Sequence, residues 1–184
     1  MQVGDTATVV GAGPIGLFFV ILLNHLGAGQ VIVSEPLEFR ANVAKKLGAD
    51  HVLNPKQIDT LEAVKKLTDG RGSDLVIDAV GYGETIAQSI SHARKGGTVL
   101  MFGDPYPGEI FSYETSKIFR REINIITSYS TTEFETNMSL SMIKNRKVDV
   151  KEFITHKFKL DDIVEALNFA TTSRNKFIKI IVAP

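Results

Sequence analysis

Three glycines near the start of the chain, Gly11, Gly13 and Gly16, follow the pattern G-x-G-x-x-G, and an acid, Glu35, comes about 20 residues later. In this pattern the first glycine permits a tight turn, the second lets the backbone approach a pyrophosphate closely, and the third lets a helix pack against a strand. A carboxylate at this distance accepts hydrogen bonds from the hydroxyls of an adenosine ribose. The four residues therefore predict a dinucleotide site.

The segments around these residues are of the kind that the pattern requires. The β-branched, apolar run Thr6–Val10 predicts a strand, the apolar stretch 14–26 predicts a helix, and residues 31–33 predict a second strand that ends close to Glu35. Pro14 stands near the start of the helix, where its missing N–H costs nothing. The free N–H groups and the dipole of that helix end favour a phosphate.

Two other interpretations of the glycines remain open. A glycine-rich turn in an ordinary α/β protein accounts for the glycines but leaves Glu35 without a role. A methyltransferase that binds S-adenosylmethionine also places an acid after its second strand, although its usual loop is G-x-G-x-G rather than the pattern seen here.

Composition excludes several classes of function. The 184 residues carry 21 basic and 21 acidic side chains, so no basic field for nucleic acid is indicated. The absence of cysteine excludes disulfides, thiol nucleophiles and cysteine-ligated zinc, and it is consistent with a reducing cytoplasm. The N-terminus is polar, and the longest apolar run, 15–23, is about half the length that spans a bilayer. We therefore expect a cytoplasmic protein without nucleic-acid or membrane partners.

Strand and helix patterns alternate along most of the chain, which predicts an α/β fold with a doubly wound, six-stranded parallel sheet in the order 3-2-1-4-5-6. Strands are expected at 6–10, 31–33, 50–53, 73–80, 98–102 and 123–127, with a turn at 95–97 and a further short strand at 109–113. Helices are expected at 14–26, 38–47, 58–68, 82–93, 116–120 and from Thr131 or Thr132 to 146. A strand–helix–strand tail at 153–158, 160–170 and 177–182 suggests a division into residues 1–147 and 148–184.

Several motifs in this order resemble the cofactor-binding half of the medium-chain, zinc-dependent alcohol dehydrogenases, most closely the threonine and polyol (sorbitol-like) dehydrogenases. The matching segments are GDTATVVGAGPIGL at 4–17, GAGQVIVSEPLEFRANVAKKLGADHVLNP at 27–55, GSDLVIDAVG at 72–81, KGGTVLMFG at 95–103, ITHKFKLDDIVEALNFA at 154–170 and the closing KIIVAP. The resemblance covers essentially the whole chain.

The resemblance and the motif together suggest how NAD is held. Gly11, Gly13, Pro14, Ile15 and Gly16 would surround the pyrophosphate, and Glu35 would hold the adenosine ribose and repel a 2′-phosphate. Arg40 is expected beside the ribose, as in NAD-using members, although an arginine there also accommodates a 2′-phosphate. The other expected contacts are Ala79, Val80 and Gly81 at the riboses, Phe102, Gly103 and Asp104 at the nicotinamide, and Ser128 near the carboxamide.

The resemblance also implies a reaction, which is hydride transfer between nicotinamide and a secondary alcohol. Family members carry their zinc ligands in an N-terminal catalytic domain, and this chain begins about where that domain ends, so zinc and the alcohol substrate are expected only with that domain. We therefore expect the isolated chain to be inactive. A non-enzymatic NAD-binding module is the alternative.

Two further expectations concern the rest of the chain. Residues 109–113 resemble the edge strand through which family members pair their sheets across a two-fold axis, and the apolar tail lacks its partner domain, so the resemblance implies a homodimer. His156 is interpreted as a structural residue.

Overall fold

The computed structural model describes residues 1–173 and 175–184, and they form two compact units, Met1–Tyr129 and Ser130–Pro184. The first unit holds the glycine pattern and Glu35. The expected division into residues 1–147 and 148–184 concerns the two domains of the family and stays a prediction; by its own contacts, the segment 130–147 groups with the C-terminal unit.

A six-stranded sheet forms the centre of the first unit, and its strands follow the order β3-β2-β1-β4-β5-β6 with every neighbouring pair parallel. The strands are β1 (Thr6–Val10), β2 (Gln30–Ser34), β3 (His51–Leu53), β4 (Ser73–Asp78), β5 (Ala93–Met101) and β6 (Asn124–Thr127). This order confirms the predicted doubly wound α/β fold.

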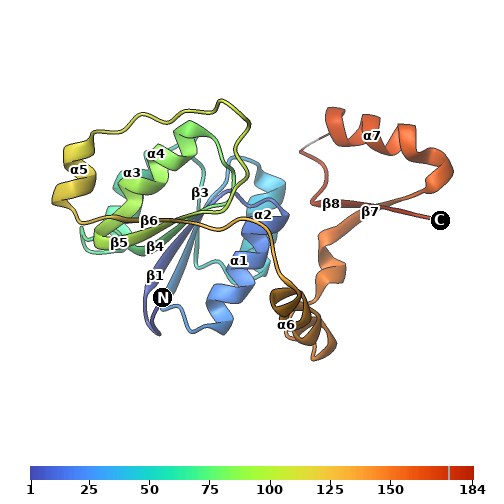
Figure 1. The fold of residues 1–184 in the computed structure, drawn as a ribbon, viewed down its shortest axis with the longest axis horizontal. Helices are drawn as coiled ribbons and strands as arrows, with labels where there is room; N and C mark the ends of the chain where they lie inside the picture. The colour runs from blue at the N-terminus through green and yellow to red at the C-terminus, as the bar shows by residue number, and fades with distance from the viewer. Residues whose placement is uncertain (174) are drawn as a thin grey trace. The chain divides into compact units, whose positions relative to one another are not determined.

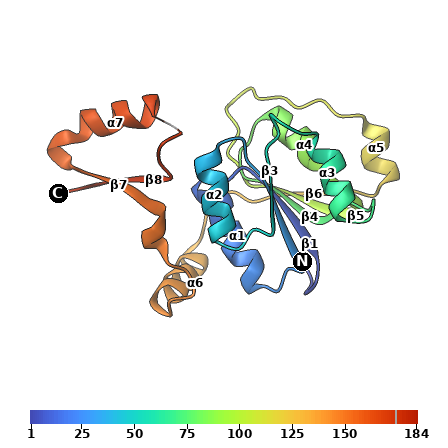
Figure 2. The ribbon, with the colours of Figure 1, turned by 180° about the vertical axis from the view of Figure 1, so that it is seen from behind.

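Helices cover both faces of this sheet. Figures 1 and 2 show α1 and α2 on one face, and α3 and α4 on the other. The helices of the unit are α1 (Pro14–His25), α2 (Glu38–Lys46), α3 (Thr60–Leu67), α4 (Gly83–His92) and the short α5 (Thr115–Arg120). All five residues of β1 are buried, because a central parallel strand covered on both faces must be apolar throughout.

The fifth strand begins earlier than predicted. Residues 95–97, expected as a turn before the strand, lie within β5. The register with β4 passes from Ser73 opposite Ala93 to Leu75 opposite Thr98, so the extra residues form a bulge, and Gly96 takes a φ of +67° there. The glycines therefore mark an irregularity inside the strand rather than its beginning.

The predicted strand at 109–113 is wrong, because this segment has no regular secondary structure. Its alternating apolar residues have another use, since Phe111 and Tyr113 pack against the core cluster between the sheet and α4. Glu109 fixes the segment at its other end by accepting a hydrogen bond from the Gly83 N–H at 2.6 Å. Residues 109–113 therefore form an irregular connection that is held against the core by its alternating apolar side chains and against the start of α4 by Glu109.

The C-terminal unit contains α6 (Glu133–Lys144), β7 (Ile154–Lys159), α7 (Ile163–Thr172) and β8 (Lys179–Ala183), with β7 and β8 paired in parallel. Thr132 caps α6 and exchanges hydrogen bonds with Glu135, as the sequence predicts. The His156 ring lies 4.6 Å from that of Phe169, between centroids, within an aromatic cluster of this unit, and its structural role stays a prediction. None of the helices in the described part of the chain combines the length and apolarity needed to span a bilayer.

Candidate dinucleotide site

A cleft of about 700 Å³ opens at the carboxyl ends of β1, β2 and β4. The strand order reverses between β1 and β4, and open α/β sheets bind their ligands at such a switch point. The lining residues are Val10, Gly11, Gly13, Ser34, Glu35, Pro36, Leu37, Arg40, Pro55, Lys56, Ala79, Val80, Tyr82, Glu84, Thr85 and Gln88.

Glu35 is the buried acid of this cleft, with 4% of its surface exposed. Its two carboxylate oxygens accept the N–H groups of Ala12, at 2.7 Å, and of Leu37, at 2.9 Å. The carboxylate thus ties the glycine turn to the start of α2. Because an ionised carboxylate has about four acceptor positions, it retains the capacity to accept two more donors, such as the hydroxyls of a ribose.

Gly11 and Gly16 are required by the protein itself. Gly11 has a φ of +92°, which few other residues adopt. A Cβ added to Gly16 would lie 1.9 Å from the carbonyl oxygen of Gly11, so α1 packs against the turn only because position 16 has no side chain.

Gly13 is different, because nothing in the protein requires a glycine there. Its φ is −67°, and an added Cβ would meet only the Nη1 of Arg40, at 4.0 Å. The space beside Gly13 therefore belongs to the cleft, and a bound group that approaches the backbone closely would fill it. This is the place that the sequence pattern assigns to a pyrophosphate, and the residues present fit that group.

The N-terminus of α1 faces this space without a cap of its own. Gly13 offers no side chain to the first turn, Pro14 is the first helical residue, and the first turn contains no acid. The N–H groups there are therefore available to an anion, and the helix dipole favours one.

The opposite wall of the cleft follows β4. Asp78 is fully buried at the end of this strand, and its Oδ1 accepts the N–H groups of Val80, at 2.8 Å, and Gly81, at 3.1 Å. Burial raises the pKa of Asp78, and these hydrogen bonds with that from Thr85 offset the rise only in part. Asp78 thus shapes the turn that carries Ala79 and Val80 into the cleft.

The ends of β4 and β5 are held together by backbone contacts. The N–H groups of Phe102, at 3.0 Å, and Gly103, at 2.8 Å, both donate to the carbonyl of Asp78. A Cβ on Gly103 would lie 2.3 Å from the backbone nitrogen of Gly81, so this approach depends on the glycine at position 103.

The structure brings together only part of the predicted site. Gly11, Gly13, Glu35, Arg40, Ala79 and Val80 line the cleft, whereas Pro14, Gly16, Gly81 and Gly103 are not among its lining residues. Ile15 and Phe102 line a separate apolar hollow of about 250 Å³, where the Phe102 ring meets that of Phe19 edge to face at 5.0 Å between centroids. Asp104 and Ser128 are exposed and are not among the residues that line the cleft. The roles expected for these residues stay predictions.

Sequence reasoning missed several lining residues. Pro55 and Lys56 follow β3, and Tyr82 follows β4, so the rule that ligands bind at the carboxyl ends of strands would have found them. Thr85 and Gln88 lie on α4, and the sequence has no local signal for which face of this helix turns toward the cleft.

The described residues include no group of three or more His, Asp or Glu side chains placed to hold a metal ion. The described side chains therefore do not fit a zinc site.

Comparison with known proteins agrees with this geometry. The sequence profile of the zinc-binding dehydrogenase family matches residues 14–145. The chain is 30% identical to a sorbitol dehydrogenase of Bacillus subtilis (strain 168) over all of its length and 52% of the relative. It is 33% identical to an L-threonine 3-dehydrogenase of Pyrococcus furiosus, over 85% of the chain and 45% of the relative.

A solved structure has the same fold. A zinc-binding dehydrogenase of Sinorhizobium meliloti 1021 bound to NADP superposes on the whole chain with a TM-score of 0.92 and 27% identity, over 53% of its own length. The chain thus spans about half the length of the relatives it matches.

Proposed function

Because the chain belongs to the zinc-binding dehydrogenase family, we propose that it is the NAD(H)-binding portion of an alcohol, polyol or threonine-type dehydrogenase. Such an enzyme transfers a hydride between nicotinamide and a secondary alcohol, and the nicotinamide carries the hydride. The observation that carries the proposal is the buried carboxylate of Glu35, which is fixed by the Ala12 and Leu37 N–H groups at the edge of an open glycine turn.

The proposed binding mode follows the cleft. The pyrophosphate lies against the backbone of Gly11 and Gly13 and the N-terminus of α1, where Pro14, Ile15 and Gly16 begin the helix. The adenosine ribose donates its hydroxyls to Glu35, and Ala79–Gly81 border the cofactor on the opposite wall. Phe102, Gly103, Asp104 and Ser128 stand on the nicotinamide side.

We assign NAD rather than NADP to this site because a 2′-phosphate would lie against the carboxylate of Glu35. Arg40 opposes this preference in part, since its guanidinium reaches to within 4.0 Å of the position that a Cβ on Gly13 would take. At that place it also serves the pyrophosphate, which both cofactors share. The Sinorhizobium relative was solved with NADP, so the affinities of this chain for NAD and NADP must be compared directly.

For this chain the assigned task is to bind and orient the cofactor, and we expect no turnover of an alcohol by the chain alone. The groups that would polarise the alcohol and take its proton are assigned to the catalytic domain that family members carry. We also propose a cytoplasmic location, which the absence of cysteine supports, and assembly as a homodimer.

Calorimetric titration of the chain with NAD, NADP and S-adenosylmethionine tests the proposal. We expect NAD to bind at least tenfold more tightly than NADP and S-adenosylmethionine not to bind. Glu35→Gln keeps the shape of the side chain but removes its charge, so NAD should bind about tenfold more weakly, which is about 1.4 kcal/mol. In this variant the difference in affinity between NAD and NADP should become smaller.

The matched control is Glu38→Gln, which removes an exposed acid from the first turn of α2 without touching the cleft. This variant should bind like the wild type. Equal affinity for NAD and NADP in the wild type would refute the assigned preference, and binding of S-adenosylmethionine alone would refute the dehydrogenase assignment.

A further inference from the structure

A second hollow, of about 390 Å³, lies at the amino ends of the sheet's strands, whereas the dinucleotide cleft lies at their carboxyl ends. Gly72, which precedes β4, and Ala93, which begins β5, contribute to its wall, so it opens at the amino ends of these strands. Its volume lies within the range of small-molecule sites in proteins.

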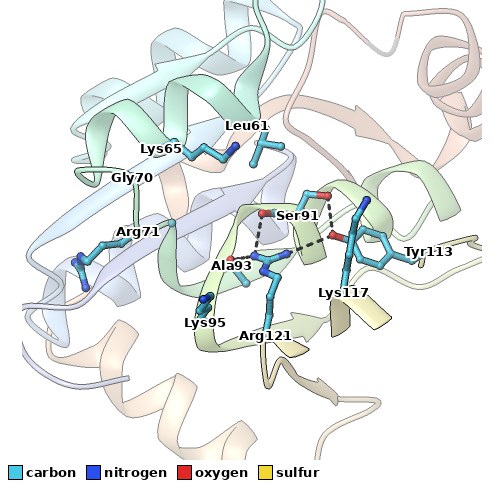
Figure 3. Close-up of a pocket in the computed structure, with 11 residues that line it drawn as sticks. Leu61, Lys65, Gly70, Arg71, Ser91, Ala93, Lys95, Tyr113, Lys117 and Arg121 are labelled. Carbon is cyan, nitrogen blue, oxygen red and sulfur yellow. Dashed lines mark hydrogen bonds between the residues drawn. The ribbon is translucent and has the colours of Figure 1, made fainter. Parts of the chain in front are cut away.

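Basic side chains gather in this hollow from different parts of the fold. Lys65 comes from α3, Lys95 from β5, Lys117 from α5 and Arg121 from the residue after α5, while no carboxylate is among the lining residues (Figure 3). Lys65 pairs with Glu62 on α3, and Lys117 pairs with Glu114, the residue before α5.

Three further cations line the hollow, and one of them, Arg71, has the carboxylate of Asp74 nearby, whose pKa its charge helps to lower. Lys95 and Arg121 form no ion pair within the ranges 1–173 and 175–184. A concave surface of one sign concentrates its field on an ion of the opposite sign.

Arg121 forms the floor of the hollow and is held rigidly. Its guanidinium donates to the carbonyl oxygens of Ile90 and Ser91, each at 3.3 Å, and of Ala93. These acceptors are neutral, so the positive charge of Arg121 is positioned but not neutralised.

The hydroxyl of Tyr113 is a further donor aimed into the same space. It accepts hydrogen bonds from Ser91 Oγ, at 3.2 Å, and from Arg121 Nη1, at 3.4 Å, and Figure 3 shows Tyr113 beside Arg121 and Lys117. Ser91 has a single hydroxyl proton, which also donates to the Ala87 carbonyl at 3.1 Å, so Ser91 Oγ can in turn accept the proton of Tyr113. The Tyr113 hydroxyl can therefore donate either to Ser91 Oγ or to a bound anion.

We propose that this hollow is an anion site for a small phosphate-bearing metabolite, bound by Lys95, Lys117, Arg121 and the Tyr113 hydroxyl. A phosphate group matches a set of donors without any carboxylate, and charge-assisted bonds to it are the strong ones. Leu61 and the Tyr113 ring provide an apolar wall for the organic part of such a molecule. The proposal is independent of dinucleotide binding, which concerns the carboxyl ends of the strands.

A competing explanation is that the cations only complement the negative ends of helices. It accounts for Lys65 in the last turn of α3. It also accounts for Arg121, whose guanidinium donates to a carbonyl oxygen near the C-terminal end of α4. It gives no reason for Lys95 on a strand, and the two explanations differ in how substitution of these residues changes anion binding.

The test is calorimetric titration with inorganic pyrophosphate at low ionic strength, with NAD present at saturation so that the dinucleotide cleft is filled. The double variant K95A/K117A removes two exposed cations and should weaken pyrophosphate binding at least tenfold. The control K46A/K66A removes the same charge from exposed positions outside both hollows and should change binding less than twofold. Tyr113→Phe keeps the ring, removes the hydroxyl and should weaken binding about fivefold.

The outcomes separate this proposal from the function proposed above. Equal losses in K95A/K117A and K46A/K66A, or no loss in Tyr113→Phe, would show that pyrophosphate responds to diffuse charge and would overturn the site. Displacement of pyrophosphate by NAD would place it in the dinucleotide cleft and also overturn the site. Failure of NAD to bind refutes only the proposed cofactor function, because the variants still report on this hollow.

Discussion

At the scale of single residues, the three glycines of the turn have different reasons to be glycine. Gly11 needs its positive φ, and Gly16 leaves room for the carbonyl of Gly11, so both serve the folded protein. Gly13 has an ordinary φ and open space in front of it. We attribute the glycine at position 13 to ligand binding, since a side chain there would obstruct an approaching ligand rather than the protein itself.

This difference predicts opposite results for two alanine substitutions. Gly13→Ala should leave thermal stability nearly unchanged and weaken NAD binding at least tenfold, because the methyl group occupies the space assigned to the pyrophosphate. Gly16→Ala should destabilise the fold by several kcal/mol, roughly the cost of overpacking a site that cannot relax.

Thermal unfolding and NAD titration of the purified variants provide the measurement. If Gly13→Ala bound NAD like the wild type, the position assigned to the pyrophosphate would be wrong. If Gly16→Ala were as stable as the wild type, the turn would be less tightly packed than the structure indicates.

At the scale of elements, α3 and α4 are joined by a buried polar cluster. His92 Nε2 lies 3.1 Å from Thr60 Oγ1, which also accepts a hydrogen bond from Gln88 at 2.7 Å. The other ring nitrogen of His92, Nδ1, has no hydrogen-bond partner among the described residues. Burial lowers the pKa of His92 from 6.5 to about 4, with a nearby Asp59 opposing the shift. This histidine is therefore neutral in the folded protein at neutral pH.

The shift makes stability depend on pH in a defined direction. The unfolded chain takes up a proton at His92 near pH 6.5, whereas the folded chain resists it until about pH 4. Stability should therefore fall as pH decreases from about 6.5 to about 4, by up to about 3 kcal/mol for this group, and then level off.

Denaturant unfolding of the wild type and His92→Gln across this range provides the measurement. The variant should lack this loss of stability between about pH 6.5 and about pH 4. Asp78 acts with the opposite sign, because its raised pKa favours the folded state at low pH and the effect is lost as pH rises through that pKa. The comparison must therefore use the difference between the two proteins; an unchanged slope in His92→Gln would contradict the assignment.

At the scale of the whole molecule, the first unit ends at an open sheet edge. Among the described strands β6 pairs only with β5, and its Ile125 and Ile126 are 36% and 48% exposed. An exposed apolar edge strand can pair with another chain. Since residues 109–113 form no strand, β6 is the edge through which we expect the proposed homodimer to form.

Sedimentation of the wild type and of Ile126→Lys tests this expectation. The wild type should be dimeric, and the variant should be mainly monomeric because two lysines would meet across the two-fold axis. Ile110→Lys, at a residue that is 84% exposed in the connection before α5, is the control and should remain dimeric. A monomeric wild type at high concentration would refute the dimer.

Most of the local structure could be predicted from the sequence. The six strands, the helices between them, the glycine turn and the position of Glu35 all depend on residues close together in the chain, where periodicity, glycine and capping preferences act directly. The predictions at 95–97 and 109–113 were wrong because a bulge and an irregular docked segment have the same local patterns as a turn and a strand.

The sequence by itself therefore determined the kind of fold and the glycine turn after β1. Only the tertiary structure decided that Gln88 shares a cleft with Glu35, and that Lys95, Tyr113 and Arg121 meet in one hollow. These residues are far apart or on different elements, and their meeting depends on strand order and on the paths of the connecting segments. Such convergence is a property of packing in three dimensions, which no local pattern of residue types encodes.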